Sequence, residues 1–217
     1  MSNAWDDRAE AYRNSVTHAT DRDLDLVVEL CAPHDGMSAL DVATGGGHVA
    51  RRLREAGAKV VTVDASRGME PDVVAPAERL PFDDGSFDVV VTRIAPHHFT
   101  DIRAAVAELA RVSRDRVVVE DTLYTSEDVE RAEKLRDPTH IRSYTEEEWR
   151  TMLADAALEV QRVEFFEKTH DLDAWLARTG CTGVEADRVR ELLAAVTSDD
   201  GTTWHDRKII LQAKKKV

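Results

Sequence analysis

Three consecutive glycines, Gly45 to Gly47, constrain this chain more than any other feature. They follow a short apolar run at 39–43 and precede a helix-like segment at 48–56. A strand, a glycine turn and a helix in this order bring backbone N–H groups and a helix N-terminus close to a ligand. We therefore expect a binding site at this turn, because a Cβ atom there would block the close approach or the positive φ.

A second apolar strand follows this helix and ends in an acidic residue. The run 59–64 places Asp64 at the carboxyl end of the strand, where a carboxylate can accept hydrogen bonds from both hydroxyls of a ribose. The turn and the acid together predict a nucleoside cofactor. A dinucleotide site uses Gly-x-Gly-x-x-Gly, and here Gly45-x-Gly47 is followed by Ala50, so this spacing alone leaves NAD open.

Strand-like and helix-like segments alternate from Ser38 onward. Short apolar runs predict strands, and apolar residues at helical spacing predict helices. We expect strands at 39–43, 59–64, 73–75, 87–92, 116–120, 158–167 and 202–213, and helices at 24–31, 48–56, 101–112 and after the capping box Thr145-x-x-Glu148. This order predicts an α/β fold with a parallel, doubly wound sheet that binds its ligand at the carboxyl ends of the strands.

Four ordered segments resemble one known family. Asp41-x-Ala43-x-Gly45-x-Gly47 resembles motif I of the class I S-adenosylmethionine (SAM)-dependent methyltransferases, with Ala43 in the place of the first glycine. Segments 77–90 and 93–99 are similar to the approach to that family's fourth strand and to the loop after it. Segment 135–144 is similar to a segment found in a bacterial branch of the family, which is related to the ubiquinone/menaquinone-type methyltransferases (methyltransferase type 11-like).

The resemblance implies a Rossmann-like, seven-stranded sheet with an antiparallel last strand and helical cap insertions. It also implies a single methyltransferase domain over 5–217, with an N-terminal helical cap at 5–35 and helical insertions at 121–157 and 169–200. By the same resemblance, SAM is the cofactor and S-adenosylhomocysteine the product. The residues expected to bind the cofactor are Tyr12, Asp41, Ala43, Thr44, Gly45, Gly47, His48, Asp64, Ala65, Ala77, Glu78 and Arg93.

His97 and His98 lie just after the fourth strand and are the expected catalytic residues. Histidine titrates near neutral pH and can remove a proton from the methyl acceptor. We place His97 at the methyl-transfer end of the pocket and expect turnover to rise through a pKa near that of histidine. Two alternatives stay open: the histidines line the pocket without removing a proton, and Arg93 pairs with a nearby acid instead of contacting the cofactor's carboxylate.

Two departures from the family fall on the adenine side of the expected pocket. Only eight residues, 65–72, join the second and third strands, fewer than a helical crossover needs. We expect the usual helix there to be absent or reduced to a single turn. Pro76 also stands where relatives carry an aspartate that would bind the adenine amino group. These departures predict weak cofactor affinity.

Composition narrows the possible partners. The chain has 29 basic and 42 acidic residues, a net charge of −13, which argues against a nucleic-acid or anionic-membrane surface. No apolar run is long enough to span a bilayer and the first residues do not resemble a signal peptide, so we expect a cytoplasmic location. The cysteines and histidines lack metal-ligand spacing, so no metal is expected.

The sequence thus predicts a SAM-dependent methyltransferase that acts on a small molecule. One alternative is a SAM-binding homologue that does not transfer methyl, such as a rearrangement catalyst or a binding protein. A second, an NAD-type binding domain, is disfavoured because the third glycine and a second mononucleotide half are missing. The sequence leaves open the substrate, the accepting atom and the oligomeric state.

Overall fold

The computed structural model describes residues 22–216, whose strands form one seven-stranded sheet in the order β3-β2-β1-β4-β5-β7-β6. The strands are β1 (Ser38–Val42), β2 (Lys59–Asp64), β3 (Val73–Val74), β4 (Phe87–Arg93), β5 (Ser113–Thr122), β6 (Leu158–Asp171) and β7 (Thr203–Lys215). β1 to β5 pair in parallel, whereas β7 is antiparallel to both β5 and β6. The predicted doubly wound sheet with an antiparallel last strand is confirmed.

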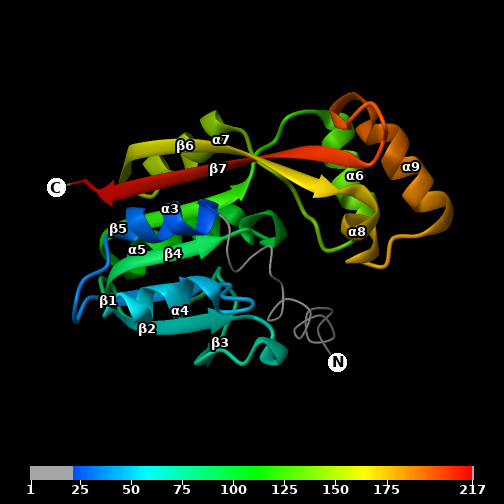
Figure 1. Ribbon diagram of the computed structural model, residues 1–217. Helices are drawn as coiled ribbons and strands as arrows, with labels where there is room; N and C mark the ends of the chain where they lie inside the picture. The colour runs from blue at the N-terminus through cyan, green and yellow to red at the C-terminus, as the bar shows by residue number, and fades with distance from the viewer. Residues whose placement is uncertain (1–21, 217) are drawn as a thin grey trace.

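Helices cover both faces of the sheet (Figure 1). α3 (Arg22–Cys31) and α4 (His48–Glu55) pack on one face, and α5 (Ile102–Val112) and α7 (Glu146–Asp155) on the other. Successive residues of the central strands therefore enter opposite halves of the core; in β4, Val90 packs on the α5 side and its two valine neighbours on the α3 side. Burial on both faces explains why these strands are continuously apolar.

The antiparallel pair of β6 and β7, which we call the hairpin, continues beyond the other strands. It carries a small lobe at its end, where helices connect the two strands (Figure 1). We define the lobe as α6 (Glu127–Arg136), α8 (Leu172–Ala177), α9 (Gly183–Leu193) and the adjoining ends of β6 and β7. It has its own apolar core, which includes Trp175, Val189 and Trp204. The segments 121–157 and 169–200 supply all three of these helices as well as α7.

The strand order reverses between β1 and β4, which are neighbours in the sheet. The connections from these two strands run in opposite directions, so the carboxyl edge of the sheet opens into a crevice at this point. Three short 3₁₀ turns complete the described part of the chain: η1 (Arg67–Met69), η2 (Pro96–His98) and η3 (Ala194–Val196). The first two of these turns border the crevice.

No helix within residues 22–216 is long and apolar enough to cross a membrane. The cytoplasmic location stays a prediction.

Candidate functional site: two adjoining cavities at the carboxyl edge of the sheet

The glycine turn joins β1 to α4 through three residues with positive φ. Ala43, Gly45 and Gly47 have φ values of +55°, +51° and +71°, a region that costs an L-residue about 1–2 kcal/mol and glycine almost nothing. Ala43, in the place of the first glycine of motif I, thus adopts a backbone conformation that glycine favours. A Cβ built on Gly45 or Gly47 meets no atom within 4 Å; at Gly45 the open space belongs to a cavity.

Asp41 holds this turn from beneath. Its buried carboxylate accepts hydrogen bonds from Thr44 Oγ1 (2.7 Å) and from the backbone N–H of Ala50 (3.1 Å) in the first turn of α4. Burial raises the pKa of Asp41 to about 6, against the lowering effect of these hydrogen bonds. Asp41 therefore holds the glycine turn in place through its Oδ2, which accepts both of these hydrogen bonds.

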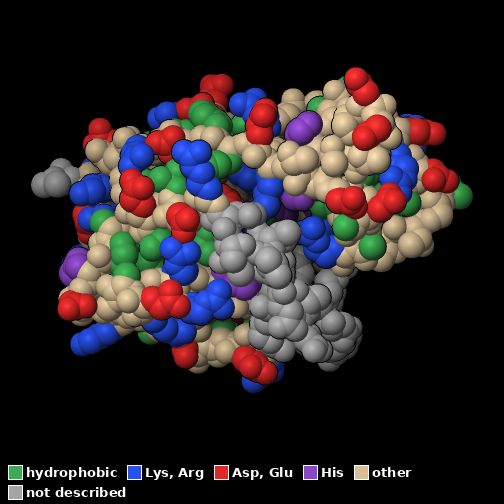
Figure 2. Space-filling model, in the orientation of Figure 1, with side chains coloured by type: hydrophobic (Ala, Val, Ile, Leu, Met, Phe, Trp, Pro, Cys, Tyr) green, Lys and Arg blue, Asp and Glu red, His purple; other side chains and the backbone are tan. Residues whose placement is uncertain are grey.

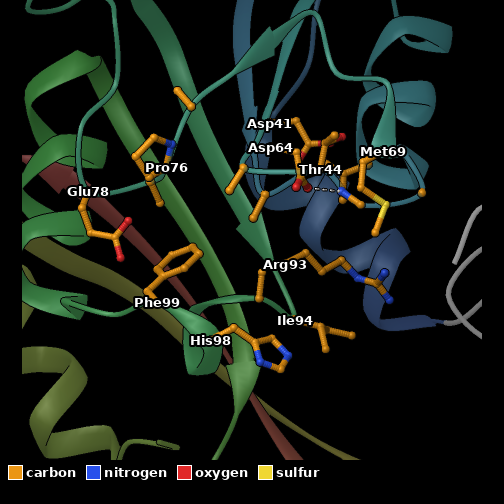
Figure 3. Close-up of a pocket in the computed structure, with 18 of the residues that line it drawn as sticks. Asp41, Thr44, Asp64, Met69, Pro76, Glu78, Arg93, Ile94, His98 and Phe99 are labelled. Atoms are coloured by element: carbon orange, nitrogen blue, oxygen red, sulfur yellow. Dashed lines mark hydrogen bonds between the residues drawn. The ribbon is translucent and has the colours of Figure 1, made fainter. Parts of the chain in front are cut away.

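Asp64 lies at the carboxyl end of β2, beside the turn. Its Oδ2 accepts a hydrogen bond from Gly45 N–H (3.0 Å), and its Oδ1 accepts one from Ser66 N–H (2.9 Å). These bonds hold the carboxylate of Asp64 at the edge of the turn, where it lines a cavity. Figure 3 shows Asp64 and Thr44 together on one wall, with Met69 next to them.

A cavity of about 250 Å³ opens in front of this turn, at the crevice between β1 and β4. Figure 3 shows Pro76, Glu78 and Phe99 on the wall opposite Asp64, and Ile94 and His98 at one end. We call this space the first cavity. The expected cofactor residues among its lining are Asp41, Ala43, Thr44, Gly45, His48, Asp64, Ala65, Ala77, Glu78 and Arg93.

Two expected cofactor residues are not in that lining. Gly47 is the N-cap of α4, and its positive φ, rather than space for a ligand, is what requires glycine there. Tyr12 lies outside the described residues. Glu78 lines the cavity and also accepts hydrogen bonds from Thr100 and Asp101 N–H at 2.8 and 3.3 Å, joining its segment to the loop after β4.

The shortened crossover has the expected form. Between β2 and β3 the chain makes one 3₁₀ turn, η1, and no longer helix. Met69 from this turn is buried and lines the first cavity, as does the exposed Pro76. Met69 and Pro76 therefore give this side of the first cavity an apolar lining.

Arg93 sits in a buried ion-pair triad. Its Nε donates to Glu120 and one Nη donates to Asp23 of α3, each at 2.7 Å, and the three side chains are at most 5% exposed. Burial raises the pKa of Glu120 to about 8. Burial acts to raise the pKa of Asp23 too, but Arg93, Glu120 and Lys168 together hold it below its usual range. The triad thus joins α3 to the sheet. Arg93 pairs with nearby acids, which is one of the two alternatives left open by the sequence.

His97 and His98 differ in the cavities that they line. His98 lines the first cavity, whereas His97 is absent from its lining and lines a second cavity of about 70 Å³ next to it. His98 and Ile94 line both cavities. His97 does not line the first cavity, because the 3₁₀ turn Pro96–His98 directs the two imidazoles to different surroundings. Its place at the methyl-transfer end and its catalytic role stay predictions.

His97 forms a buried pair with Asp121. Its Nδ1 lies 2.5 Å from Oδ1 of Asp121, which is fully buried. Burial, together with the charges of His140 and Lys208, holds the pKa of His97 well below its usual value. Burial lowers the pKa of His98 to about 3, with a further contribution from His97. Both imidazoles are therefore uncharged at neutral pH.

The second cavity lies between the sheet edge and the lobe, where Figure 2 shows histidine and basic side chains at the surface. Sequence reasoning missed most of the residues that β5, β6, β7, α6 and the loops after α6 and α8 supply to it: Thr122, Glu133, Arg136, Asp137, His140, Lys168, His170, Arg178, Asp206 and Lys208. The change from valine to acid in Val117–Asp121, at the end of a buried strand, is the one local signal of polar residues here. Although several histidines lie close together, no group of three or more His, Cys, Asp or Glu residues within 22–216 could hold a metal ion.

The fold and the first cavity define a class of protein: a seven-stranded sheet with antiparallel β7, a glycine turn after β1 and an acid at the end of β2 are the features of class I methyltransferases. The profile of the methyltransferase domain family Methyltransf_11 matches residues 40–119. YcgJ of Bacillus subtilis, described as an uncharacterised methyltransferase, is 31% identical over 208 residues, covering 85% of this chain and 81% of YcgJ. The chain belongs to the family of class I SAM-dependent methyltransferases.

Solved structures agree with this assignment. The YcgJ crystal structure superposes with a TM-score of 0.82 over 89% of this chain and 98% of YcgJ. A candidate methyltransferase from Bacillus halodurans, 28% identical, gives a TM-score of 0.79 over 91% of this chain and 100% of its own. A demethylmenaquinone methyltransferase of Corynebacterium urealyticum is 37% identical over 103 residues, 44% of this chain and 42% of that enzyme.

Proposed function

We propose that the protein is a SAM-dependent methyltransferase that acts on a small molecule. The observation that carries the proposal is the hydrogen bond from Gly45 N–H to Asp64 at the rim of the first cavity. It places a carboxylate beside a glycine turn, in front of a cavity of about 250 Å³, in a chain of the methyltransferase family.

The residues of the first cavity fit this cofactor. Asp64 would hold the ribose hydroxyls, because its carboxylate lines the cavity at the carboxyl end of β2, beside the glycine turn. Gly45 would let the cofactor approach the backbone, since no side chain occupies that space. The lining carries three carboxylates, Asp41, Asp64 and Glu78, against one guanidinium, a balance that suits a ligand bearing sulfonium and ammonium groups. When bound, SAM supplies an electrophilic methyl group, so the reaction requires neither a metal nor a covalent enzyme intermediate.

Arg93 would act on the cofactor indirectly. Asp23 and Glu120 engage its guanidinium within the protein, so we propose that it supports the wall of the cavity and the position of α3. His48 would line the cavity at the start of α4, where its Nδ1 lies 3.2 Å from Nη2 of Arg51.

His97 would remove a proton where the methyl acceptor is a hydroxyl or an activated carbon. With Nδ1–H donated to Asp121, the lone pair of the imidazole is on Nε2. The low pKa keeps the ring uncharged and able to accept a proton, and Asp121 would then stabilise the imidazolium. His98, at the border of both cavities, would place donor and acceptor in line.

Calorimetric titration with SAM, S-adenosylhomocysteine and NAD tests the cofactor assignment. We expect SAM and S-adenosylhomocysteine to bind one to one, with micromolar or weaker affinity, and NAD not to bind. Incubation with methyl-labelled SAM and a low-molecular-weight cell extract then tests transfer, by mass spectrometry of labelled products. A bound but unconsumed SAM, together with conversion of an unlabelled compound, would instead support the non-transferring alternative.

A further inference from the structure

The chemistry of the second cavity differs from that of the first. Its walls are predominantly polar, and Ile94 and Trp175 are the two apolar residues in its described lining. An apolar ring system would find little surface there to bury. The cavity is also small, about 70 Å³, which suits a compact polar group.

Cationic side chains reach this cavity from four separate segments. Arg136 comes from α6, Lys168 from β6, Arg178 from the residue after α8, and Lys208 from β7. The lining carboxylates are Glu133, Asp137 and Asp206. Cations therefore outnumber carboxylates around this space, although the whole chain carries a net charge of −13, and the first cavity has the opposite balance.

Lys208 has the most constrained environment of these cations. It is 5% exposed, and its Nζ donates to Thr122 Oγ1 at 2.6 Å and pairs with Asp206 at 2.5 Å. An ammonium group has three N–H donors, so two partners leave one donor for a ligand. The nearby acids hold the pKa of Lys208 above its usual value despite burial, which keeps the group charged.

Arg136 is also held in place at the cavity wall. Its guanidinium stacks 4.0 Å from the ring centroid of Trp175, and Nε donates to the carbonyl of the same residue at 3.1 Å. Its ion pair with Glu133 is long, at 3.5 Å, and burial raises the pKa of that glutamate, favouring its uncharged form. Arg136 is thus oriented mainly by stacking, which leaves guanidinium N–H groups for an anion.

From the position and lining of this cavity we propose that it binds an anionic group, a carboxylate or a phosphate, of the methyl acceptor. The inference rests on the proposed function. Ile94 and His98 line both cavities, so a molecule in the second cavity would lie next to SAM in the first cavity and would be the methyl acceptor. The substrate is then a small polar anion, with its charged group toward Lys208 and Arg136 and its reacting atom toward His98 and the first cavity.

Imidazole NMR of the intact protein tests this inference with small probes. Acetate and inorganic phosphate are titrated at fixed pH and ionic strength, with acetamide and methylammonium as neutral and cationic comparisons. His97, His98, His140 and His170 line the cavity, whereas His34 and His205 are exposed elsewhere and serve as internal controls. We expect at least one anion to shift the four cavity histidines, with an affinity at least about tenfold above that for acetamide, because charge-assisted hydrogen bonds are the stronger ones.

Variants then locate the anion. Lys208→Met, Arg136→Gln and Arg178→Gln should each weaken anion binding, by about tenfold for a lost charge-assisted bond. Arg103→Gln is the matched control, because Arg103 forms an exposed ion pair with Asp155. If Lys208→Met does not fold, the two arginine variants decide. The inference is wrong if neither anion shifts these histidines, if acetamide binds equally well, or if the cavity variants bind as the control does.

The outcome is separable from that of the proposed function. Selective anion binding without any SAM binding would keep the anion site and reject the methyltransferase proposal. SAM binding without anion selectivity would keep the cofactor assignment and reject the anionic substrate.

Discussion

Asp23 and Asp25 lie two residues apart in the first turn of α3, and each pairs with an arginine at 2.7 Å. The two pairs differ in burial. The Asp23 and Arg93 side chains are both 5% exposed, whereas those of Asp25 and Arg52 are 60% and 34% exposed. Because both acids also interact with the same helix N-terminus, substituting each by alanine removes a similar helix-dipole contribution. The two aspartates therefore differ mainly in burial, with Lys168 as a further cation 3.7 Å from Asp23.

Asp23→Ala removes one carboxylate partner of the buried Arg93 and leaves Glu120, whose raised pKa favours its uncharged form. Removing one partner of a buried ion pair costs about 3–5 kcal/mol, because an uncompensated charge remains. Asp25→Ala should cost at most about 1 kcal/mol, as solvent-exposed pairs do. Urea unfolding followed by circular dichroism measures both, and thermal midpoints should fall by about 2–4 °C per kcal/mol in a chain of this size.

The pH dependence gives an independent check. The pKa of Asp23 is lowered in the folded state, so its stabilisation is complete at neutral pH and is lost as the pH falls through the unfolded value of about 3.9 and below. The cost of Asp23→Ala should shrink correspondingly in acid. Equal costs for the two variants at neutral pH would refute the view that the triad holds α3 on the sheet.

Three further predictions follow from the two cavities. Gly45→Val should abolish SAM binding while Gly85→Val, at a similar φ of +62° and also with open space around its Cβ, keeps it; calorimetry on the two folded variants decides, and binding by both would reject the role of Gly45. Burial lowers the pKa of His98 to about 3 in the folded protein, so its contribution to stability is present above its unfolded-state pKa of about 6.5 and is lost as the pH falls below that value. Between pH 6 and 5, the free energy of unfolding of wild type should fall by about 1 kcal/mol relative to that of His98→Gln. Parallel pH profiles of the two unfolding free energies would contradict this. His97→Ala should lower turnover by about 10²–10⁴-fold with little change in SAM affinity. Because the pKa of His97 is lowered, the turnover of wild type should rise at a pH below the pKa of free histidine. Near-normal turnover of the variant would show that His97 only lines the cavity.

Local sequence patterns predict the first cavity well. Its key features follow one another along one stretch of the chain, from β1 to β3. The glycines follow β1, Asp64 ends β2, and the eight-residue crossover after it is too short for a helix. Parallel pairing of β1 with β2 then brings Gly45 and Asp64 together without further information. This is why residues chosen from the sequence line the cavity in the structure.

The second cavity and the triad depend on contacts that no local pattern encodes. Arg93 finds Asp23 and Glu120 at sequence separations of 70 and 27 residues. The hairpin strands run past their expected ends, to Asp171 in β6 and Lys215 in β7. The extension of β6 brings Lys168 opposite Asp206 of β7, and the lobe adds Arg136. Asp206 and Lys208 lie within the strand predicted at 202–213, but no local pattern indicated that β6 and α6 would place charged residues beside them.

The most direct measurement compares the affinity of wild type and Asp64→Ala for 5′-methylthioadenosine and its 2′-deoxy analogue. A ribose contact to Asp64 predicts that wild type prefers the hydroxylated ligand by about tenfold or more, since a hydrogen bond to a charged group contributes about 1.5–3 kcal/mol. Asp64→Ala should bind both ligands equally weakly, and Asp84→Ala, an exposed acid paired with Arg111, should behave as wild type. An unchanged preference in Asp64→Ala, or no binding of either ligand by wild type, would contradict the assignment of the first cavity as the SAM site.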